Sequence, residues 1–264
     1  MDSIVSQAAK ALRNAQSSGK CIPPLRLTFK GLSTEDAYAI QKENINFHVL
    51  QGARVVGAKI GLTSVAVQKQ IGVDVPDYGV LLDNMEFPEG LPIPMSRLEQ
   101  PKIEAEVAFI LRKDLDMARP TVVDVIQAID YVAPAFEIVG SRIQNWDIQL
   151  VDTISDNASS SGYVLGTPLR KLEGLDLRYC LMTIMSGSSE GTVVSTGDGA
   201  ACLGNPLNAV VWLARVMYER GFPLKAGNVI LSGALGPMVT VQPGETYIAH
   251  IDGLGDVTAV FATA

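Results

Sequence analysis

Residues 102–111 read Lys-Ile-Glu-Ala-Glu-Val-Ala-Phe-Ile-Leu, and this stretch does most to decide the fold. Apart from its charged residues it has the composition of a buried β-strand. Side chains two positions apart point to the same face of a strand, so Glu104 and Glu106 share a face. The other face is apolar and consists of Ala105, Val107, Phe109 and Leu111. We therefore predict a strand that is covered on both sides and directs two carboxylates toward one of them.

Two like charges that point into an apolar interior need a cation between them. Without one, each carboxylate raises the pKa of the other, at a cost on the order of several kcal/mol. A third carboxylate, Glu137, lies in a second apolar run, residues 131–139. Three hard oxygen ligands on stiff strands suit Mg²⁺ or Mn²⁺. The spacing alone leaves an alternative open, in which Glu104 and Glu106 lie on an exposed sheet edge and bind no ion.

Bulk composition narrows the class of protein. The chain has 264 residues, 47% of them hydrophobic, and a net charge of −7. That length is enough for one large domain, and the absence of a Lys/Arg cluster argues against nucleic acid and anionic membranes as partners. Three widely spaced cysteines without metal-ligand spacing indicate reduced thiols. No apolar run is long enough to span a bilayer, and we expect a cytoplasmic protein.

Helical patterns come first along the chain, and short β-type runs dominate afterwards. Residues 2–18 have helical spacing, and Ser33-Thr-Glu-Asp36 is a capping box that opens a second helix through about Leu50. Two later helices are expected, one from the Thr121 cap through Tyr131 and one from Asn205-Pro206 to Arg220. The predicted strands are 55–60, 78–83, 104–111, 132–139, 162–165, 180–185, 192–195, 229–232, 239–241, 247–251 and 257–261.

This order predicts an α+β fold rather than a βαβ repeat. We expect a single catalytic domain over residues 1–264, with a helical N-terminal part (1–54) and a strand-rich body (55–264). The pair Gly253-x-Gly255 is followed by a strand, so it is a hairpin turn and not a dinucleotide-binding motif.

Two further charged residues call for an explanation. Lys59 lies in the apolar run 55–60, where its ammonium either serves an active site or, as spacing alone slightly favours, reaches water from an edge strand. Asp77 lies in a loop rich in Pro and Gly, where a surface turn is the default interpretation. The polar turns 156–161 and 232–238 either present backbone N–H groups to an anion or are plain turns.

Taken together, several segments resemble the hydratase/decarboxylase group of the fumarylacetoacetate hydrolase superfamily. The resemblance covers nearly the whole chain. It is carried by residues 35–41, 56–64 (Val-Gly-Ala-Lys-Ile-Gly-Leu-Thr-Ser), 100–106 (Gln-Pro-Lys-Ile-Glu-Ala-Glu), 136–142, 151–159, 203–206 and 231–238. One departure is Asn205, where many relatives are expected to have histidine. Either residue can cap a helix, so the departure puts little in doubt.

The resemblance implies a fold and a set of site residues. The expected fold is an N-terminal helical segment followed by a mixed β-sandwich or roll. The expected metal ligands are Glu104, Glu106 and Glu137, and Lys59 and Asp77 match the catalytic pair. The residues expected to bind substrate are Leu62, Thr63, Ser159, Ser160 and Ser232. Homo-oligomers, often pentamers or decamers, are expected, and association with a neighbouring pathway enzyme is possible for this family.

The activity that the resemblance implies is metal-dependent addition of water to 2-hydroxypenta-2,4-dienoate, giving 4-hydroxy-2-oxopentanoate in the meta-cleavage degradation of aromatic compounds. The apolar segment 234–238 suits a substrate that ends in a methylene group. The alternatives are decarboxylation of 2-oxo-3-hexenedioate, hydrolysis of an acylpyruvate, and a non-catalytic partner subunit. Because all three glutamates and Lys59 are present, the non-catalytic alternative is disfavoured.

Overall fold

The computed structural model of the chain describes residues 3–64, 68, 73–187 and 191–263. Its described α-helices are α1 (Ile4–Ser18), α2 (Leu25–Thr28), α3 (Thr34–Leu50), α5 (Val122–Ala128), α6 (Leu150–Ser155) and α7 (Pro206–Glu219). Its strands are β1 (Val55–Gly61), β2 (Asp77–Leu82), β3 (Pro92–Ile93), β4 (Lys102–Leu111), β5 (Ile129–Val139), β6 (Ser160–Leu165), β7 (Leu181–Ser186), β8 (Thr192–Asp198), β9 (Val229–Ala234), β10 (Val239–Thr240), β11 (Thr246–Ile251) and β12 (Gly255–Phe261).

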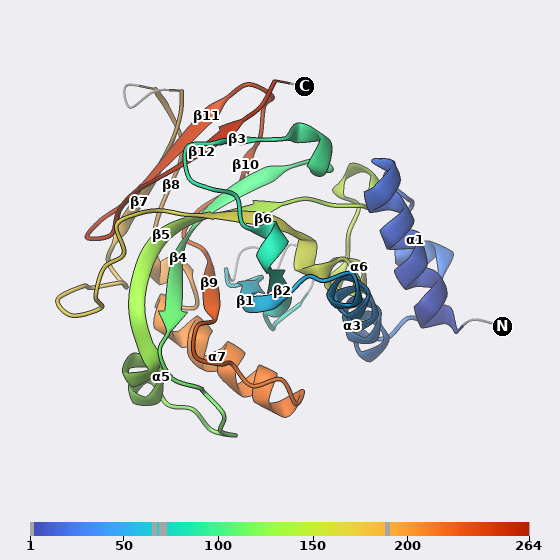
Figure 1. Ribbon diagram of the computed structural model, residues 1–264, viewed down its shortest axis with the longest axis horizontal. Coiled ribbons are helices and arrows are strands. Elements are labelled where there is room, and N and C mark those ends of the chain that lie inside the picture. Colours follow the sequence, from blue (N-terminus) through green and yellow to red (C-terminus); the bar gives the residue numbers. More distant parts are fainter. Residues whose placement is uncertain (1–2, 65–67, 69–72, 188–190, 264) are drawn as a thin grey trace.

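The strands form two mixed sheets (Figure 1). The first sheet has the order β2-β1-β9-β4-β5-β6, with the short β10 beside β4, and the second has the order β3-β12-β11-β7-β8. The strand that bears Glu104 and Glu106, β4, pairs antiparallel with both β5 and β9. It therefore lies inside the first sheet, and the predicted α+β class is confirmed.

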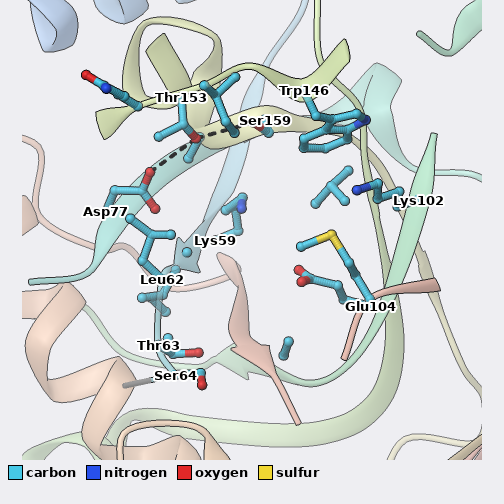
Figure 2. A pocket seen from close by; sticks show the side chains of 18 of the residues that line it. Lys59, Leu62, Thr63, Ser64, Asp77, Lys102, Glu104, Trp146, Thr153 and Ser159 are labelled. Carbon is cyan, nitrogen blue, oxygen red and sulfur yellow. Dashed lines mark hydrogen bonds between the residues drawn. The ribbon is translucent and has the colours of Figure 1, made fainter. Parts of the chain in front are cut away.

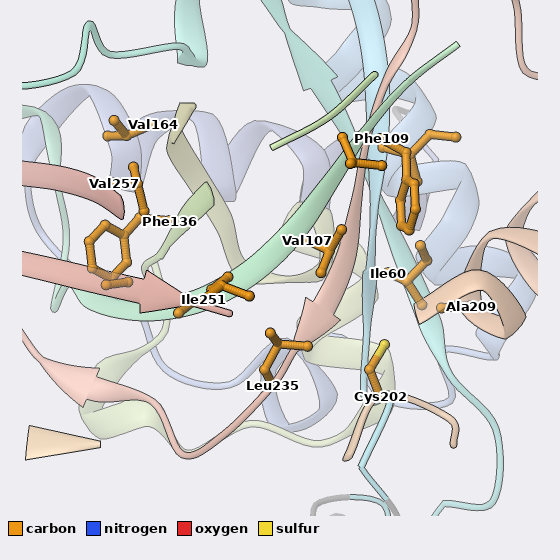
Figure 3. Close-up of a cluster of buried hydrophobic side chains, with 14 of the residues drawn as sticks. Ile60, Val107, Phe109, Phe136, Val164, Cys202, Ala209, Leu235, Ile251 and Val257 are labelled. Atoms are coloured by element: carbon orange, nitrogen blue, oxygen red, sulfur yellow. The ribbon is translucent and has the colours of Figure 1, made fainter. Parts of the chain in front are cut away.

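Because side chains alternate along the strands, one face of the first sheet is apolar and the other carries charged residues. Ala105, Val107, Phe109 and Leu111 all enter the main core, as predicted. This core continues to the second sheet and to α7 through residues such as Phe136, Leu235, Ile251, Val257 and Ala209 (Figure 3). Because side chains alternate along a strand, the other face of the same strands receives Lys59, Glu104, Glu106 and Glu137.

The N-terminal helices lie to one side of the first sheet (Figure 1). Their small core is formed by Ala8, Ala9, Leu12, Leu25, Ile40 and Ile143. The predicted capping box is present, because Ser33 Oγ accepts from Asp36 N and the Asp36 side chain accepts from Ser33 N. α3 packs against both α1 and α6. These contacts place the N-terminal helices behind one wall of the site described below.

The predicted helix at Asn205 is also confirmed. Asn205 caps α7 by accepting a hydrogen bond from Leu207 N, and Pro206 occupies the first turn. The helix predicted from Thr121 through Tyr131 is too long, however. α5 ends at Ala128, and β5 begins at Ile129. Most side chains of β5 are buried, on both faces of the sheet. Ile129 has helical spacing from Val125, but pairing with β4 decides its conformation.

In the part of the chain that the structure describes, none of the helices combines the length and the apolar character that crossing a bilayer requires.

Candidate metal-dependent active site

The three predicted carboxylates converge on one face of the first sheet. Glu104 lies directly opposite Glu137 in the β4–β5 ladder, and Glu106 follows two residues later on the same face. One carboxylate oxygen from each of the three residues lies within 4.8 Å of the others. Because β4 is an interior strand, the alternative of an exposed sheet edge is wrong. We call Glu104, Glu106, Glu137 and the adjacent Lys59 the carboxylate end of the site.

The hydrogen bonding of these carboxylates fits a divalent cation. Glu106 Oε2 accepts a 2.8 Å hydrogen bond from Gly233 N, which fixes the orientation of the carboxylate. Among the described residues, Glu106 Oε1 and both side-chain oxygens of Glu137 are buried and have no hydrogen-bond partner, although Lys59 Nζ lies 3.1 Å from Glu137 Oε2. Three clustered buried carboxylates are strongly unfavourable with one ammonium beside them, and a divalent cation would compensate the remaining charge. Three such carboxylates on rigid strands form a donor set for a hard divalent metal.

Lys59 and Asp77 lie beside the carboxylates, and both spacing-based expectations for them are wrong. The Lys59 side chain is only 3% exposed, and its Nζ lies 3.1 Å from Glu137 Oε2. β1 is flanked by β2 and β9, so Lys59 is not on an edge. Asp77 is 1% exposed and begins β2 rather than forming a surface turn. Sequence spacing alone could not show this, because strand order depends on contacts between distant segments.

Gly61 explains how the two side chains approach one another. It pairs with Asp77 across the β1–β2 ladder. A Cβ atom at Gly61 would lie 2.2 Å from Asp77 Oδ1 and 3.4 Å from Lys59 Nζ. The missing side chain therefore leaves the space that the carboxylate of Asp77 occupies.

Burial and mutual charge shift the pKa values of this cluster. Burial raises the pKa of Asp77 to about 6, although Lys59 opposes the shift. Burial and the charge of Glu137 raise the pKa of Glu104 to about 7. Burial, Glu137 and Glu104 together raise the pKa of Glu106 well above its usual range. Burial by itself lowers the pKa of Lys59, but the surrounding carboxylates outweigh burial and raise it. The lysine is therefore charged, whereas several carboxyl groups compete for protons near neutral pH.

Two hydroxyl groups connect Asp77 to the opposite wall (Figure 2). Thr153 Oγ1 lies 3.5 Å from Asp77 Oδ2 and 3.3 Å from Ser159 Oγ. Asp77 Oδ1 is buried, and none of the residues that the structure describes forms a hydrogen bond with it. Thr153, which itself contacts Ser159, therefore binds one oxygen of the Asp77 carboxyl group, and the other oxygen, Oδ1, is free to exchange a proton.

Lys59, Asp77 and Glu104 line a cavity of about 450 Å³ together with Thr153 and Ser159. Glu106 and Glu137 lie next to Glu104 but are not among the residues that line it. Of the residues expected to bind substrate, Leu62, Thr63 and Ser159 line this cavity. Ser160 and Ser232 are not among its lining residues. Ser232 Oγ is occupied inside the sheet, where it accepts from Val107 N and donates to Gly233 O.

Among the lining residues that the sequence analysis did not name as site residues are Lys102, Trp146 and Thr153. Met238 and Ala234, which also line the cavity, belong to the apolar segment 234–238 that was expected to suit the substrate tail. Lys102 precedes Glu104 by two positions on the same strand face, so the rule that united Glu104 with Glu106 also identifies it. Its Nζ lies 4.5 Å from the centre of the Trp146 ring. Trp146 lies in a segment for which the sequence predicted neither a helix nor a strand, so nothing indicated where its side chain points. We call Leu62, Trp146, Ala158 and Ser159 the rim of the cavity.

Comparison with known proteins agrees with this arrangement. Residues 61–262 match the family described as fumarylacetoacetate (FAA) hydrolase C-terminal. The chain is 56% identical over 255 residues to 2-keto-4-pentenoate hydratase of Paraburkholderia xenovorans, covering 97% of this chain and 94% of that protein. It is 53% identical over 260 residues to the protein of the same name from Burkholderia vietnamiensis, covering 98% of each.

Among solved structures, 4-oxalocrotonate decarboxylase of Pseudomonas putida G7, complexed with magnesium and adipate, has a TM-score of 0.92 to this chain at 36% identity. The match covers 98% of this chain and 97% of that one. The fold that the sequence resemblance implied is therefore confirmed.

Proposed function

The chain belongs to the fumarylacetoacetate (FAA) hydrolase family, and from that premise we propose that it is a metal-dependent hydratase. Its substrate is 2-hydroxypenta-2,4-dienoate, the enol tautomer of 2-keto-4-pentenoate, and its product is 4-hydroxy-2-oxopentanoate. This places the protein in the degradation of aromatic compounds by meta-cleavage. The relatives named 2-keto-4-pentenoate hydratase support the reaction, since they match at 53–56% identity over almost the entire chain.

One observation carries the mechanism: the three carboxylates cluster within 4.8 Å of one another, and Glu104 of this cluster lines a small cavity together with Lys59 and Asp77. Glu104, Glu106 and Glu137 would hold Mg²⁺ or Mn²⁺. When bound, the metal acts as a Lewis acid that stabilises negative charge on the carboxylate and 2-oxygen of the substrate. The magnesium complex of the related decarboxylase supports this choice of ion.

The chain's own residues manage charge and protons. The 2-hydroxyl proton leaves and C5 is protonated, which gives an α,β-unsaturated ketone. Water then adds its oxygen at C4 and a proton at C3. Lys59 stabilises the dienolate and enolate charge of these steps, because its ammonium is buried next to the metal ligands. Asp77, whose pKa is about 6, exchanges protons through Oδ1 or orients the water.

One observation favours a second function, decarboxylation of 2-oxo-3-hexenedioate: the cavity lining includes the cationic side chain of Lys102. The substrate of such an enzyme carries a second carboxylate, which needs a cation in the cavity. Arg142 does not provide it, because it pairs with Asp156 outside the lining of this cavity. Lys102 does line the cavity. The apolar residues Ala234 and Met238 in the same lining favour the hydratase, because they suit a substrate tail without charge.

The decisive experiment supplies each substrate separately with Mg²⁺ and identifies the products. We expect 4-hydroxy-2-oxopentanoate from 2-hydroxypenta-2,4-dienoate and little CO₂ from 2-oxo-3-hexenedioate. Rapid CO₂ release from the diacid, with the monoacid unchanged, would assign the protein as a decarboxylase instead.

We also propose that residues 1–264 act as one catalytic domain in the cytoplasm, and that the chain forms a homo-oligomer, a pentamer or decamer, able to associate with a neighbouring pathway enzyme. The family resemblance supports the assembly, and three free cysteines fit a reducing compartment. Light scattering of the purified protein measures the mass directly, and a monomer at micromolar concentration would refute the assembly.

A further inference from the structure

A second cavity, of about 290 Å³, lies behind the substrate cavity. It opens between the N-terminal helices and the segment 155–161. Nothing in the proposed reaction uses it. Its size is near the lower end of ligand-binding pockets, which suits a small molecule rather than a peptide or nucleotide.

The charged groups around this cavity favour an anion. Arg13, Arg97 and Arg142 line it from three separate segments of the chain. Arg142 is neutralised by the buried carboxylate of Asp156. Arg13 Nη1 forms a long ion pair with Glu43 Oε1 at 3.7 Å and donates a 2.6 Å hydrogen bond to Asn44 Oδ1. The cavity therefore has a surplus of positive charge.

Arg97 is the guanidinium most available to a ligand. Its Nη2 donates a 2.7 Å hydrogen bond to Asn84 O, and its guanidinium stacks over the Phe87 ring. Among the residues that the structure describes, no carboxylate lies within ion-pair distance of it. A planar guanidinium that is held in place but not neutralised is a common recognition group for carboxylate and phosphate.

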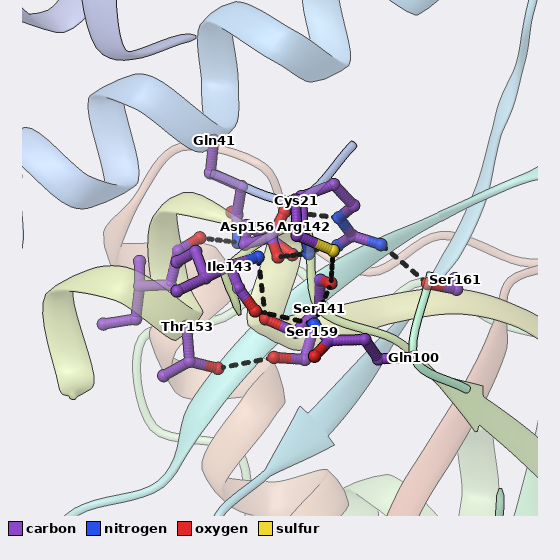
Figure 4. A network of polar contacts seen from close by, with 11 residues as sticks. Cys21, Gln41, Gln100, Ser141, Arg142, Ile143, Thr153, Asp156, Ser159 and Ser161 are labelled. Carbon is purple, nitrogen blue, oxygen red and sulfur yellow. Dashed lines mark hydrogen bonds and ion pairs between the residues drawn. The ribbon is translucent and has the colours of Figure 1, made fainter. Parts of the chain in front are cut away.

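An unpartnered hydroxyl inside the same cavity lining points independently to a ligand. Ser160 is 4% exposed and lines the second cavity, and its Oγ has no hydrogen-bond partner among the described residues. Buried hydroxyl groups are normally hydrogen-bonded. The next residue, Ser161, shows the expected behaviour, because its Oγ accepts a 2.6 Å hydrogen bond from Arg142 Nη1 (Figure 4).

The two cavities share a wall, the segment 155–161. Ala158 and Ser159 face the substrate cavity, whereas Asp156, Asn157 and Ser160 line the second one. Polar contacts hold this wall in place: Arg142 binds Asp156, and Ser159 contacts Thr153 (Figure 4). A ligand on one side of the wall is therefore in a position to shift residues on the other side.

We propose that the second cavity binds a small oxyanion, a carboxylate or phosphate, through Arg97, Arg13 and Ser160. The bound anion alters substrate binding or turnover through the shared wall. Coupling between two such sites is reciprocal, so substrate analogues in the first cavity also change the affinity of the anion.

The test uses the full chain loaded with Mg²⁺ and calorimetric titration with inorganic phosphate in one arm and succinate in the other. We expect one site per chain for at least one of the two anions. Arg97→Met should weaken binding by about tenfold, since a charge-assisted hydrogen bond is lost. Arg215→Met, on the surface of α7, is the matched control and should leave binding unchanged. Glu106→Gln should also retain binding, because this variant removes only a metal ligand.

Each outcome decides the proposal. Binding lost in Glu106→Gln and kept in Arg97→Met would mean that the anion binds the active-site metal, which overturns the second site. No binding of either anion would overturn it as well. For the coupling, the rate of hydration is measured with and without the anion that binds. We expect the anion to change kcat or KM in the native chain and to have no effect in Arg97→Met. An anion that binds without changing either constant refutes the coupling.

Discussion

The carboxylate end and the rim of the substrate cavity are built in opposite ways. The carboxylate end belongs to β1, β4 and β5, which are each paired on both sides within the first sheet. Every residue of the rim instead has left-handed backbone without being glycine. The φ values are 57° at Leu62, 55° at Trp146, 51° at Ala158 and 58° at Ser159.

The difference shows how the fold divides two tasks. Left-handed conformation costs a non-glycine residue about 1 kcal/mol, so it persists only where surrounding contacts enforce it. Three like-charged carboxylates need fixed positions to bind one cation, and interior strands provide them. The rim shapes the space around the substrate, and its irregular turns allow side chains to face the cavity where a strand would not direct them. We therefore expect changes at the carboxylate end to affect turnover and changes at the rim to affect substrate binding.

Removing a metal ligand should have the largest effect. Glu106→Gln should lower kcat/KM by at least about 10³-fold, because the charge that binds the metal is reduced and the Lewis acid is lost. Without metal the variant should melt at a higher temperature than the native chain, since one of three repelling carboxylates is gone. Kinetics and calorimetry with Mg²⁺ measure both effects, with the exposed Glu219→Gln as control. Full activity of the native chain in excess chelator would contradict a role for metal.

Lys59→Ala tests the other charged group of the carboxylate end. We expect kcat to fall by about 10²-fold, a typical loss when one preorganised charge-stabilising group is removed. Stoichiometric Mg²⁺ binding should remain, because the lysine is not a ligand. The exposed Lys171→Ala is a suitable control, since its ammonium pairs with Asp130 at the surface. An unchanged kcat would show that Lys59 only neutralises Glu137 in the folded protein.

A single added methyl group should disturb the same end without removing any charge. In Gly61→Ala the new Cβ would overlap Asp77 Oδ1 at 2.2 Å, so the carboxylate must turn away. We expect kcat to fall by about tenfold or more while the melting temperature changes little, because a side chain can move. Gly57→Ala provides the contrast, since its Cβ would meet the backbone oxygen of Val229 at 1.8 Å. That variant should lose stability. If both variants lost stability equally, Gly61 would be a packing residue only.

The sequence predicts the parts of this site that depend on neighbouring residues, and it fails for the parts that depend on contacts between distant segments. Side-chain alternation is a local property of a strand, so the spacing of two residues between Glu104 and Glu106 was enough to predict that they share a face. The burial of Lys59 was not predictable, because it requires β9 and β2 to flank β1, and these strands are distant in sequence. The family resemblance, which compares whole segments, did identify Lys59 and Asp77 as a pair.

The rim was harder still. Asn157, Ala158 and Ser159 adopt three consecutive left-handed conformations with no glycine among them. Sequence rules assign this conformation mainly to Gly, Asn and Asp, so Ala158 gave no indication of it. Packing around α6, which the helical patterns also missed, enforces the turn. The rim therefore depends on tertiary contacts that no local pattern encodes.

The affinity for metal should depend on pH, which tests the electrostatics of the carboxylate end. Carboxylates must lose their protons to bind Mg²⁺, and the pKa of Glu104 is raised to about 7. As the pH falls through 7, protons compete with the metal, so the dissociation constant should rise by about tenfold between pH 8 and pH 6. Calorimetry in two buffers of different ionisation enthalpy should detect protons released on binding at pH 6. Binding without proton release would place the carboxyl pKa values in their ordinary range.

The smallest effect is expected at the rim, and it tests whether the two ends really divide binding from turnover. Trp146 Nε1 donates a 3.0 Å hydrogen bond to Gln100 O, and the ring lies under the ammonium of Lys102. Trp146→Phe keeps an aromatic ring for Lys102 but loses the donor. A neutral hydrogen bond contributes about 1 kcal/mol, so KM should rise by about threefold to fivefold while kcat stays nearly constant. Comparing the five-carbon dienoate with one that carries an extra terminal methyl group shows whether the rim also selects the substrate tail. If Trp146→Phe lowered kcat and left KM unchanged, the rim would contribute to the chemical steps, and the division of tasks between the two ends would be wrong.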